Sequence, residues 1–301
     1  MHHRRSSRRA ATLAATLFVL SFLPGAVWSA PLQLGLFADL HAHEVDSPGE
    51  GKVMANYAER LQAFVDDMSA WQADLVIQLG DFVNGVYVQL APYVDVERIP
   101  LVLEDALALL AGYAGPVYHV IGNHDVYSLS KQEFLDRTGD AETYFSFDAG
   151  AFHFVVLDAQ YDRDGNDLAH MFWGVQGNIP EAELDWLRDD LAATDRPTVV
   201  CIHQPLDVES STLTGENPIV INNHDVMNVL VASGVVVAVF QGHDHENRHS
   251  IIDGIHYVTF QAMVDHAEPT EPSWARITLD NDARTIVIAG HGDQADLTIA
   301  Y

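Results

Sequence analysis

The chain has 301 residues, of which 48% are hydrophobic and 19% are charged. This length and hydrophobic content suffice for one large domain or two small ones with a buried core, and they exclude an intrinsically disordered chain. The formal net charge is −28, from 43 acidic and 15 basic residues. A charge of this sign repels phosphate backbones and anionic membrane surfaces, which argues against a protein that binds nucleic acid polymers.

Residues 1–29 have the composition of an export signal. Several arginines precede an apolar run, and the run ends in small residues. The alternative is a membrane anchor, but the run is short for a span and contains Pro24 and Gly25, so we expect cleavage after Ser29. The sequence therefore predicts an exported protein, periplasmic or extracellular, with no stable membrane insertion after cleavage.

Strand-like and helix-like segments alternate along the rest of the chain. The predicted strands are apolar throughout, as strands buried on both faces are. This alternation predicts an α/β sandwich with largely parallel strands, and no repeat or linker divides residues 30–301, which we expect to form a single domain. The segments, in chain order, are a strand at 32–38, a helix at 52–72, a strand within 74–79, a helix at 99–113, a strand at 117–121, a helix at 180–193, a strand at 197–202, a helix at 224–234 and a strand at 235–241.

Three further segments depart from this alternation and resemble β-hairpins. Glycines at 150 and 254 would form two of the turns, and Asn281 with Asp282 would form the third. We therefore expect antiparallel strands in addition to the parallel ones.

Polar side chains follow five of the predicted strands, at the point where each strand ends. In an open α/β sheet the carboxyl ends of the strands line one crevice, so these groups could converge although they lie far apart in the sequence. A single buried histidine is more often a hydrogen-bonded core residue than a ligand, but five coincident strand ends favour a common site. The residues, strand by strand, are Asp39 and His41, then Asp81, then Asn123 and His124, then His203, and finally His243 and His245.

The donor types at these strand ends suit divalent metal ions. Carboxylate, imidazole and amide oxygen bind Mn, Fe, Zn or Ni, whereas no set of thiolates favours a structural zinc site. One carboxylate can bridge two ions, and the number of donors supports two ions better than one. Two such ions would activate a bridging hydroxide and neutralise charge on an attacked phosphoryl group, which is the chemistry of a phosphoester hydrolase.

The fragments "DLH", "GD", "GNHD", "IHQP" and "GHDH" occur in the order and approximate spacing of the calcineurin-like metallophosphoesterase superfamily, which this chain resembles over nearly all of residues 30–301. The resemblance implies a two-sheet sandwich flanked by helices and a pair of metal ions. It implies that the first metal binds Asp39, His41 and His245, that the second binds Asn123, His203 and His243, and that Asp81 bridges them.

The resemblance also implies a role for the residue beside Asn123. His124 matches a histidine that contacts phosphate in the family and can protonate the leaving oxygen. Asp125 would then orient His124 or, equally, cap the turn, and both readings stay open. Glycines at 122 and 242 would permit close approach of the backbone at the crowded site. Asn84 could hydrogen-bond near the metals, but its pairing with Gly85 favours a simple turn.

Within the superfamily the chain is most similar to the manganese-dependent ADP-ribose/CDP-alcohol diphosphatases. The segments "QLGDFVNG", "VYHVIGNHDVY", "VVLDAQ", "AELDWLRDDL" and "IAGHG" carry this likeness, which favours manganese as the metal. That group has glutamine at the position of His41, and this departure leaves the substrate open.

These observations lead to one main hypothesis and one alternative. The main hypothesis is a secreted binuclear enzyme that hydrolyses phosphoester or pyrophosphate bonds of small, nucleotide-like substrates. The alternative is a non-catalytic metal-binding or scaffold protein on the same fold. The presence of all seven expected ligands and of His124 favours the enzyme.

Overall fold

The computed structural model describes residues 30–46, 52–85, 96–170, 177–208, 220–264 and 272–301. The predicted export signal at residues 1–29 lies outside these ranges. Within them, no helix has both the length and the apolar character that a membrane crossing needs.

The first of two six-stranded sheets in the described residues contains the amino-terminal strands. Its order is β12-β11-β10-β1-β2-β3, with β1, β2 and β3 parallel and the other neighbours antiparallel. The hairpin predicted at Asn281 and Asp282 joins β10 to β11. The strands are β1 (Leu32–Phe37), β2 (Leu75–Gln78), β3 (Val117–His119), β10 (Trp274–Asp280), β11 (Thr285–His291) and β12 (Leu297–Ala300).

The second sheet has the order β4-β5-β6-β7-β9-β8, with β5, β6, β7 and β9 parallel. The two other predicted hairpins, at Gly150 and Gly254, form the antiparallel pairs β4–β5 and β8–β9. The expectation of largely parallel strands therefore holds for the centre of the second sheet and for one side of the first, β1 to β3. The strands are β4 (Phe145–Ala149), β5 (Phe152–Val156), β6 (Thr198–Ile202), β7 (Val236–Gln241), β8 (Arg248–Ile252) and β9 (Ile255–Thr259).

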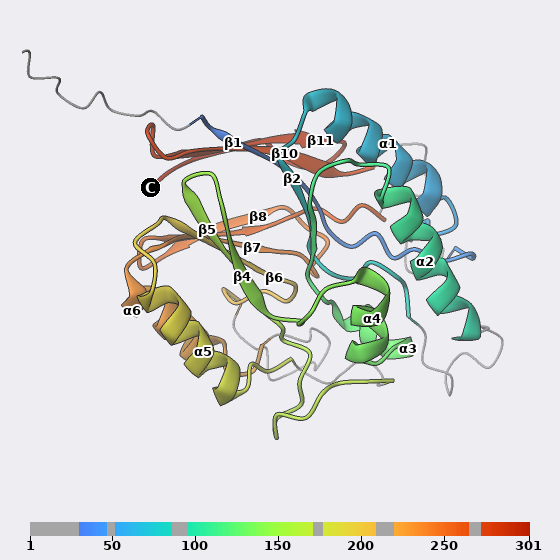
Figure 1. Ribbon diagram of the computed structural model, residues 1–301, viewed down its shortest axis with the longest axis horizontal. Helices are drawn as coiled ribbons and strands as arrows, with labels where there is room; N and C mark the ends of the chain where they lie inside the picture. The colour runs from blue at the N-terminus through green and yellow to red at the C-terminus, as the bar shows by residue number, and fades with distance from the viewer. Residues whose placement is uncertain (1–29, 47–51, 86–95, 171–176, 209–219, 265–271) are drawn as a thin grey trace, which may run out of the picture.

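Four longer helices cover the outer faces of the two sheets, α1 and α2 on one side and α5 and α6 on the other (Figure 1). This arrangement confirms the predicted two-sheet sandwich flanked by helices. The helices are α1 (Tyr57–Trp71), α2 (Ile99–Leu110), α5 (Glu181–Ala192) and α6 (Asn223–Ser233).

Three short helical segments were not expected from the alternation of apolar residues: η2 (Val96–Arg98), α3 (Asn123–Ser128) and α4 (Lys131–Thr138). The start of α4 carries a recognisable signal, since Ser130 Oγ accepts a hydrogen bond from the Glu133 amide at 3.2 Å and Glu133 accepts one from the Ser130 amide at 2.8 Å. This reciprocal pair is a capping box, which a Ser followed three residues later by Glu indicates.

Two successive residues of each central strand belong to two different hydrophobic cores. In β1, Leu36 lies between the sheets, whereas Phe37 packs under α1 and α2. In β5, Phe154 lies between the sheets, whereas Val155 packs under α5 and α6. Because successive side chains of a strand point to opposite faces, a strand covered on both faces must be apolar at every position. This explains why the central strands show no polar alternation in the sequence.

Candidate metal centre

All seven predicted ligands and His124 meet where the carboxyl ends of strands from both sheets come together. Strands β1, β2 and β3 of the first sheet and β6 and β7 of the second lead into them. Contacts cross from sheet to sheet: His203 Nε2 is 3.2 Å from Asp81 Oδ2, and His245 Nε2 is 3.4 Å from Asp39 Oδ1. The expectation of a crevice along one sheet is therefore wrong in this detail, because the crevice is shared by two sheets.

The first predicted group of donors is compact. His41 Nε2 lies 3.2 Å from His245 Nε2 and 3.9 Å from Asp39 Oδ1. Ligand atoms from these three residues all lie within 4.8 Å of one another. One ion could therefore contact all three side chains.

The second predicted group contains Asp81, His203 and His243, whose ligand atoms also lie within 4.8 Å of one another. Asn123 joins it, since its Oδ1 is 3.2 Å from His203 Nε2, while its Nδ2 donates to the Tyr127 hydroxyl at 2.8 Å. The Asp81 carboxylate also faces the first group, because its Oδ2 is 3.5 Å from the Nε2 atom of His41. Asp81 thus lies between the two groups, where a bridging ligand would have to be.

The backbone is strained at five of the candidate ligands. Residues with φ in the left-handed region are costly unless they are glycine, at about 1–3 kcal/mol each, and they persist where the surrounding structure enforces them, often at functional sites. These φ angles are 54° at Asp39, 46° at His41, 52° at Asp81, 71° at His243 and 58° at His245.

Asp81 and Asp39 each accept a backbone amide with one carboxylate oxygen and direct the other oxygen towards the candidate metal centre. Asp81 Oδ1 accepts the His124 amide at 2.7 Å, and Asp39 Oδ2 accepts the His243 amide at 3.0 Å. Asp39 Oδ1 is buried and has no hydrogen-bond partner in the described part of the chain. A buried carboxylate oxygen without a donor is costly, and a bound cation would satisfy it. The donor set therefore fits divalent metal ions.

Two histidines are oriented through the ring nitrogen that points away from the centre. His41 Nδ1 donates to Asn84 Oδ1 at 2.9 Å, and His203 Nδ1 donates to the Leu79 carbonyl at 2.8 Å. These bonds direct both Nε2 atoms inward, as the outer hydrogen bonds of metal-binding histidines do. Of the two readings of Asn84, the simple turn that the sequence favoured is wrong, and the hydrogen bond near the metals is present, because its side chain holds His41.

The charges at the centre favour a bound cation, although His203 must release a proton before its imidazole can bind a metal. Burial raises the pKa of Asp81, but His203 and His124 outweigh it, so the pKa lies well below its ordinary value. Burial lowers the pKa of His41 well below its usual range and that of His243 to about 4. For His203, burial lowers the pKa, but Asp81 outweighs it and raises the pKa to about 9. The buried carboxylates therefore attract positive charge strongly.

His124 lies beside the two groups of donors. Its ring centroid is 4.5 Å from that of His41, its Nδ1 has no hydrogen-bond partner among the described residues, and burial lowers its pKa to about 3. One of its ring nitrogens also lies within 4.8 Å of ligand atoms of His41 and Asp81. His124 is therefore placed to touch a molecule bound at the metals.

Asp125 forms hydrogen bonds with the backbone. Its Oδ1 accepts the Val83 amide at 3.0 Å and its Oδ2 accepts the Gly122 amide at 2.8 Å. Both oxygens are thus engaged in holding the loops that carry Asp81 and His124. Of the two readings left open by the sequence, this geometry favours the turn cap, so Asp125 is a positioning residue and the prediction that it is catalytic is not supported by its contacts.

Gly122 and Gly242 allow the close approach that the sequence predicted. A Cβ at Gly122 would overlap the backbone nitrogen and the carboxylate of Asp81, and one at Gly242 would lie 2.7 Å from Asp39 Oδ2. Any larger residue at either position would push a carboxylate out of place.

A buried pair of glutamines behind the centre was missed by the sequence interpretation. Gln160 and Gln204 exchange hydrogen bonds of 2.8 and 3.1 Å through their amide groups, and Gln160 Nε2 also lies 3.2 Å from the Ile121 carbonyl. The pair thus connects the loop that precedes Asn123 to the residue that follows His203. Both glutamines follow the ends of strands, so the strand-end criterion could have found them.

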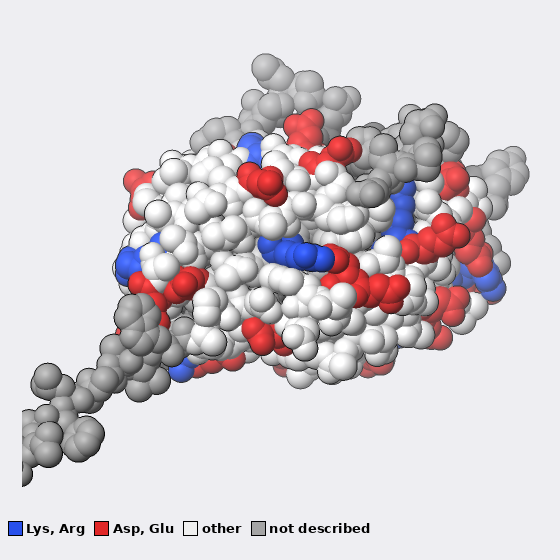
Figure 2. Space-filling view, turned by 90° about the horizontal axis from the view of Figure 1, so that it is seen from above, with Lys and Arg blue, Asp and Glu red and all other residues white. Residues whose placement is uncertain are grey.

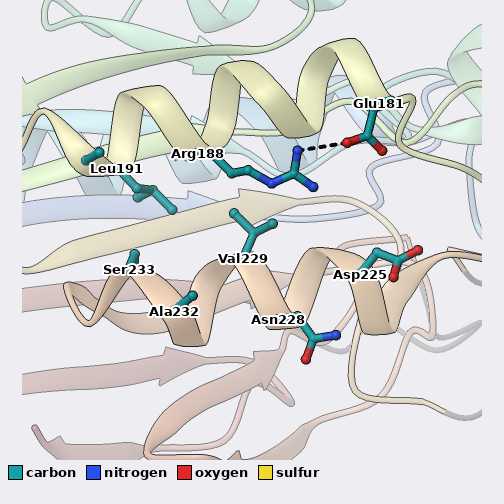
Figure 3. A pocket seen from close by; sticks show the side chains of 9 residues that line it. Glu181, Arg188, Leu191, Asp225, Asn228, Val229, Ala232 and Ser233 are labelled. Atoms are coloured by element: carbon teal, nitrogen blue, oxygen red, sulfur yellow. Dashed lines mark hydrogen bonds and ion pairs between the residues drawn. The ribbon is translucent and has the colours of Figure 1, made fainter.

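A groove of about 610 Å³ lies elsewhere, between α5 and α6 (Figure 3). None of the predicted site residues lines it, and Arg188 in its wall is paired with Glu181 at 2.8 Å. The groove lies between two helices, whereas the candidate metal ligands lie at the ends of strands, so the groove is not part of the candidate metal centre.

A two-sheet sandwich with clustered carboxylates and imidazoles at its strand ends is an architecture for metal-dependent hydrolysis. A comparison with family models gives the particular family: the model for calcineurin-like phosphoesterases matches residues 32–247, and the chain belongs to this family. The matched range includes every predicted site residue. The chain is accordingly a hydrolase that acts on phosphoester or diphosphate bonds.

The chain is also similar to two curated proteins, both named manganese-dependent ADP-ribose/CDP-alcohol diphosphatase. The protein from Oryza sativa subsp. japonica is 23% identical over 265 residues, which cover 75% of this chain and 78% of the relative. The protein from Bos taurus is 24% identical over 249 residues, which cover 65% and 71%. The resemblance predicted from the sequence is confirmed.

Two solved structures share the fold. A dimetal phosphatase from Danio rerio has a TM-score of 0.74 at 21% identity and covers 90% of this chain and 99% of its own. A purple acid phosphatase from yellow lupin has a TM-score of 0.57 at 14% identity and covers 90% of this chain and 54% of its own. At these identities the two likenesses show a common fold.

Proposed function

We propose that this protein is a binuclear metal-dependent hydrolase that cleaves phosphoester or diphosphate bonds of small, nucleotide-like molecules. The observation that carries the proposal is the position of Asp81 between two groups of buried donors. In this proposal Asp39, His41 and His245 hold the first metal, Asn123, His203 and His243 hold the second, and Asp81 binds both.

Two divalent ions, when bound, would supply an activated water and neutralise charge on the phosphoryl oxygens. His124 acts on the leaving group. In the protein alone burial holds its pKa at about 3, so the ring is neutral and can donate a hydrogen bond. A phosphoryl anion next to the ring would raise this pKa, because opposite charge favours the protonated form. The imidazole could then take up a proton from water and pass it to the departing oxygen, which would return the ring to its neutral form.

The names of the relatives support manganese as the metal and ADP-ribose or a CDP-alcohol as the substrate class. Polymeric nucleic acid is a poor candidate, because the net charge is −28 and acidic side chains are spread over the face in Figure 2, with basic ones often directly beside them. Attraction for an anionic substrate would therefore be confined to the metal centre and its rim.

Export is a second part of the proposal, and the composition of residues 1–29 supports it. Expression of the full chain in a bacterial host, followed by fractionation and amino-terminal sequencing, would test it. A mature chain beginning near Ala30 outside the cytoplasm is expected. A full-length chain retained inside the cell would contradict export.

The enzymatic part is tested with protein stripped of metal and then supplied with Mn²⁺. Three substrates are compared in parallel: nitrophenyl phosphate, bis-nitrophenyl phosphate, and ADP-ribose with a coupled phosphatase. Manganese-dependent turnover that is fastest with ADP-ribose is expected. Preference for a simple ester would move the substrate class to general phosphoesters. Bound metal without turnover of any substrate would favour the non-catalytic alternative.

A further inference from the structure

The loop Gly242–His245 carries a candidate ligand for each metal and has an unfavourable backbone. Both His243 and His245 have positive φ, and the amide of Asp244 between them is 2.8 Å from the Gly242 carbonyl. Such a conformation persists only where contacts from outside the loop enforce it. The contacts that hold this loop therefore also determine where its two imidazoles lie.

Each of the three residues after Gly242 is held by a different part of the protein. The His243 amide donates to Asp39 Oδ2 at 3.0 Å, and the His245 carbonyl accepts from Gln261 Nε2 at 2.6 Å. Asp244 is held through its side chain, which forms an ion pair with Nη1 of Arg248. The Asp244 side chain is 14% exposed and that of Arg248 is 32% exposed, so water screens this pair only in part.

The other end of the same guanidinium reaches a second site loop. Arg248 Nη2 is 3.1 Å from Asp207 Oδ1, and Asp207 lies four residues after His203. The Asp207 side chain is 1% exposed and is fixed by two further hydrogen bonds of 2.6 Å, from Gln241 Nε2 and from Ser250 Oγ. These contacts hold the Asp207 carboxylate in one position, so it can fix the guanidinium of Arg248 in turn.

Gln241 strengthens the same connection. It lies two residues before His243, and its Oε1 accepts the Leu206 amide at 2.9 Å. The loop after β6 and the loop after β7 are thus connected at two places, by Gln241 near their strands and by Arg248 farther out.

We propose that Arg248 is a positioning residue that sets the spacing of the two metal sites. It holds Asp244, and with it the imidazoles on either side, at a fixed distance from the loop that carries His203. The inference rests on the proposed function, since it takes His203, His243 and His245 as ligands. A guanidinium donates to two carboxylates from separate nitrogens of a rigid plane, whereas the three donors of an ammonium share one atom at the end of a flexible stem, so Lys is not expected to hold the same spacing.

The test compares Arg248→Met with Arg276→Met as a matched control. Arg276 also forms an ion pair with an aspartate, Asp67, and the side chains are 41% and 19% exposed. This second pair lies on β10 and α1, away from the donor cluster. Each full-length protein is titrated with Mn²⁺ and followed by electron paramagnetic resonance, which reports both the affinity and the magnetic coupling between two neighbouring ions.

We expect Arg248→Met to weaken binding of Mn²⁺ by about 10–100-fold and to reduce the signal of coupled ions, as loss of an outer hydrogen-bond partner does at metal sites. Arg248→Lys should behave like Arg248→Met. Arg276→Met should bind Mn²⁺ within about twofold of the wild type, even if its melting temperature falls. Equal affinity and coupling in Arg248→Met and the wild type would overturn the inference.

A loss of folding in Arg248→Met would not end the test. Asp244→Asn removes the same ion pair from the loop while leaving the bond between Arg248 and Asp207 in place, and it should weaken binding of Mn²⁺ in the same direction. Unchanged affinity in folded Asp244→Asn would contradict the inference. A different result would contradict the proposed function: a wild-type protein that does not bind two Mn²⁺ ions.

Discussion

Asp81 Oδ1 accepts the backbone N–H of His124 at 2.7 Å, which leaves Oδ2 to face both His41 and His203. One carboxylate therefore fixes the start of α3, where the candidate proton donor lies, relative to both groups of metal ligands. Since the side chain is 2% exposed, water cannot replace either interaction. The position of His124 and the position of the metals are thus set by the same residue.

Asp81→Asn separates these two roles. Asparagine keeps an oxygen that can accept the His124 amide, so the fold of the loop should survive, but it lacks the charge that a bridging ligand supplies. We expect fewer than two Mn²⁺ ions per chain and a fall in turnover of at least about 100-fold. Metal analysis of the purified protein and initial rates would check this, with Asp67→Asn as a control. Turnover within tenfold of the wild type would exclude a bridging role.

His124→Ala distinguishes a proton donor from a metal ligand. If His124 acts on the leaving group, the variant should keep two Mn²⁺ ions per chain and lose about 10²–10⁴-fold in kcat. His119→Gln is the control, because His119 is also buried, with a pKa that burial lowers to about 4, but it lies on β3 outside the donor groups. Loss of one ion from His124→Ala would instead make His124 a ligand.

The candidate metal ligands could be predicted because the ends of buried strands can be recognised in the sequence. A buried strand that stops at Asp81 or at Asn123 shows a sharp change from apolar to polar residues, and the order of these changes matches the family. The pairing of strands into two sheets was available only through that resemblance. Apart from Gln33 in β1 and Thr198 at the start of β6, both strands are apolar, and nothing in such a strand says which sheet it joins.

The residues that orient the donors could not be predicted in the same way. Asn84 precedes a glycine, and this dipeptide is typical of a turn whether or not its side chain binds a histidine. Arg248 looks in the sequence like any surface cation, and its pairing with Asp207 spans 41 residues. Such contacts depend on the relative positions of loops, which local patterns do not specify.

Asn84→Ala tests the orientation of His41. Without the amide oxygen, His41 Nδ1 loses its acceptor and the ring is free to turn, so we expect about 10–100-fold weaker binding of one Mn²⁺ ion. The unsatisfied buried group should also lower the free energy of unfolding by about 1–3 kcal/mol. Asn178→Ala is a matched control, since the two residues are 9% and 8% exposed. Calorimetric titration that gives equal affinities for both variants would contradict the orienting role.

Lys52 is one of two lysines in the chain and influences the centre electrostatically. After burial, which is the larger cause, its ammonium group contributes to the low pKa of both His41 and His124. We expect Lys52→Met to raise KM for ADP-ribose by about threefold to tenfold, and the difference should shrink at high salt because salt screens the charge. Lys131→Met is the control, because Lys131 is ion-paired with Asp158 at 2.7 Å. A KM difference independent of salt would contradict this explanation.

The buried carboxyl group of Glu183 should make the free energy of unfolding depend on pH. This carboxyl on α5 is fully buried; its Oε1 accepts the Asp158 amide at 2.9 Å, and its Oε2 has no hydrogen-bond partner in the described ranges. Burial and the neighbouring Asp158 raise its pKa well above the ordinary value of 4.5. The folded state therefore retains a proton that the unfolded state releases above pH 4.5.

Since the folded state binds the extra proton, this group makes the protein less stable as the pH rises from 4.5 towards the raised pKa. The slope is at most about 1.4 kcal/mol per pH unit for one proton. Glu183→Gln removes this contribution, so its free energy of unfolding relative to the wild type should increase as the pH is raised from about 5 to 8. Urea unfolding across this range would measure it, with the exposed Glu181→Gln as control. A constant difference between Glu183→Gln and the wild type would show that Glu183 is already ionised in the folded protein.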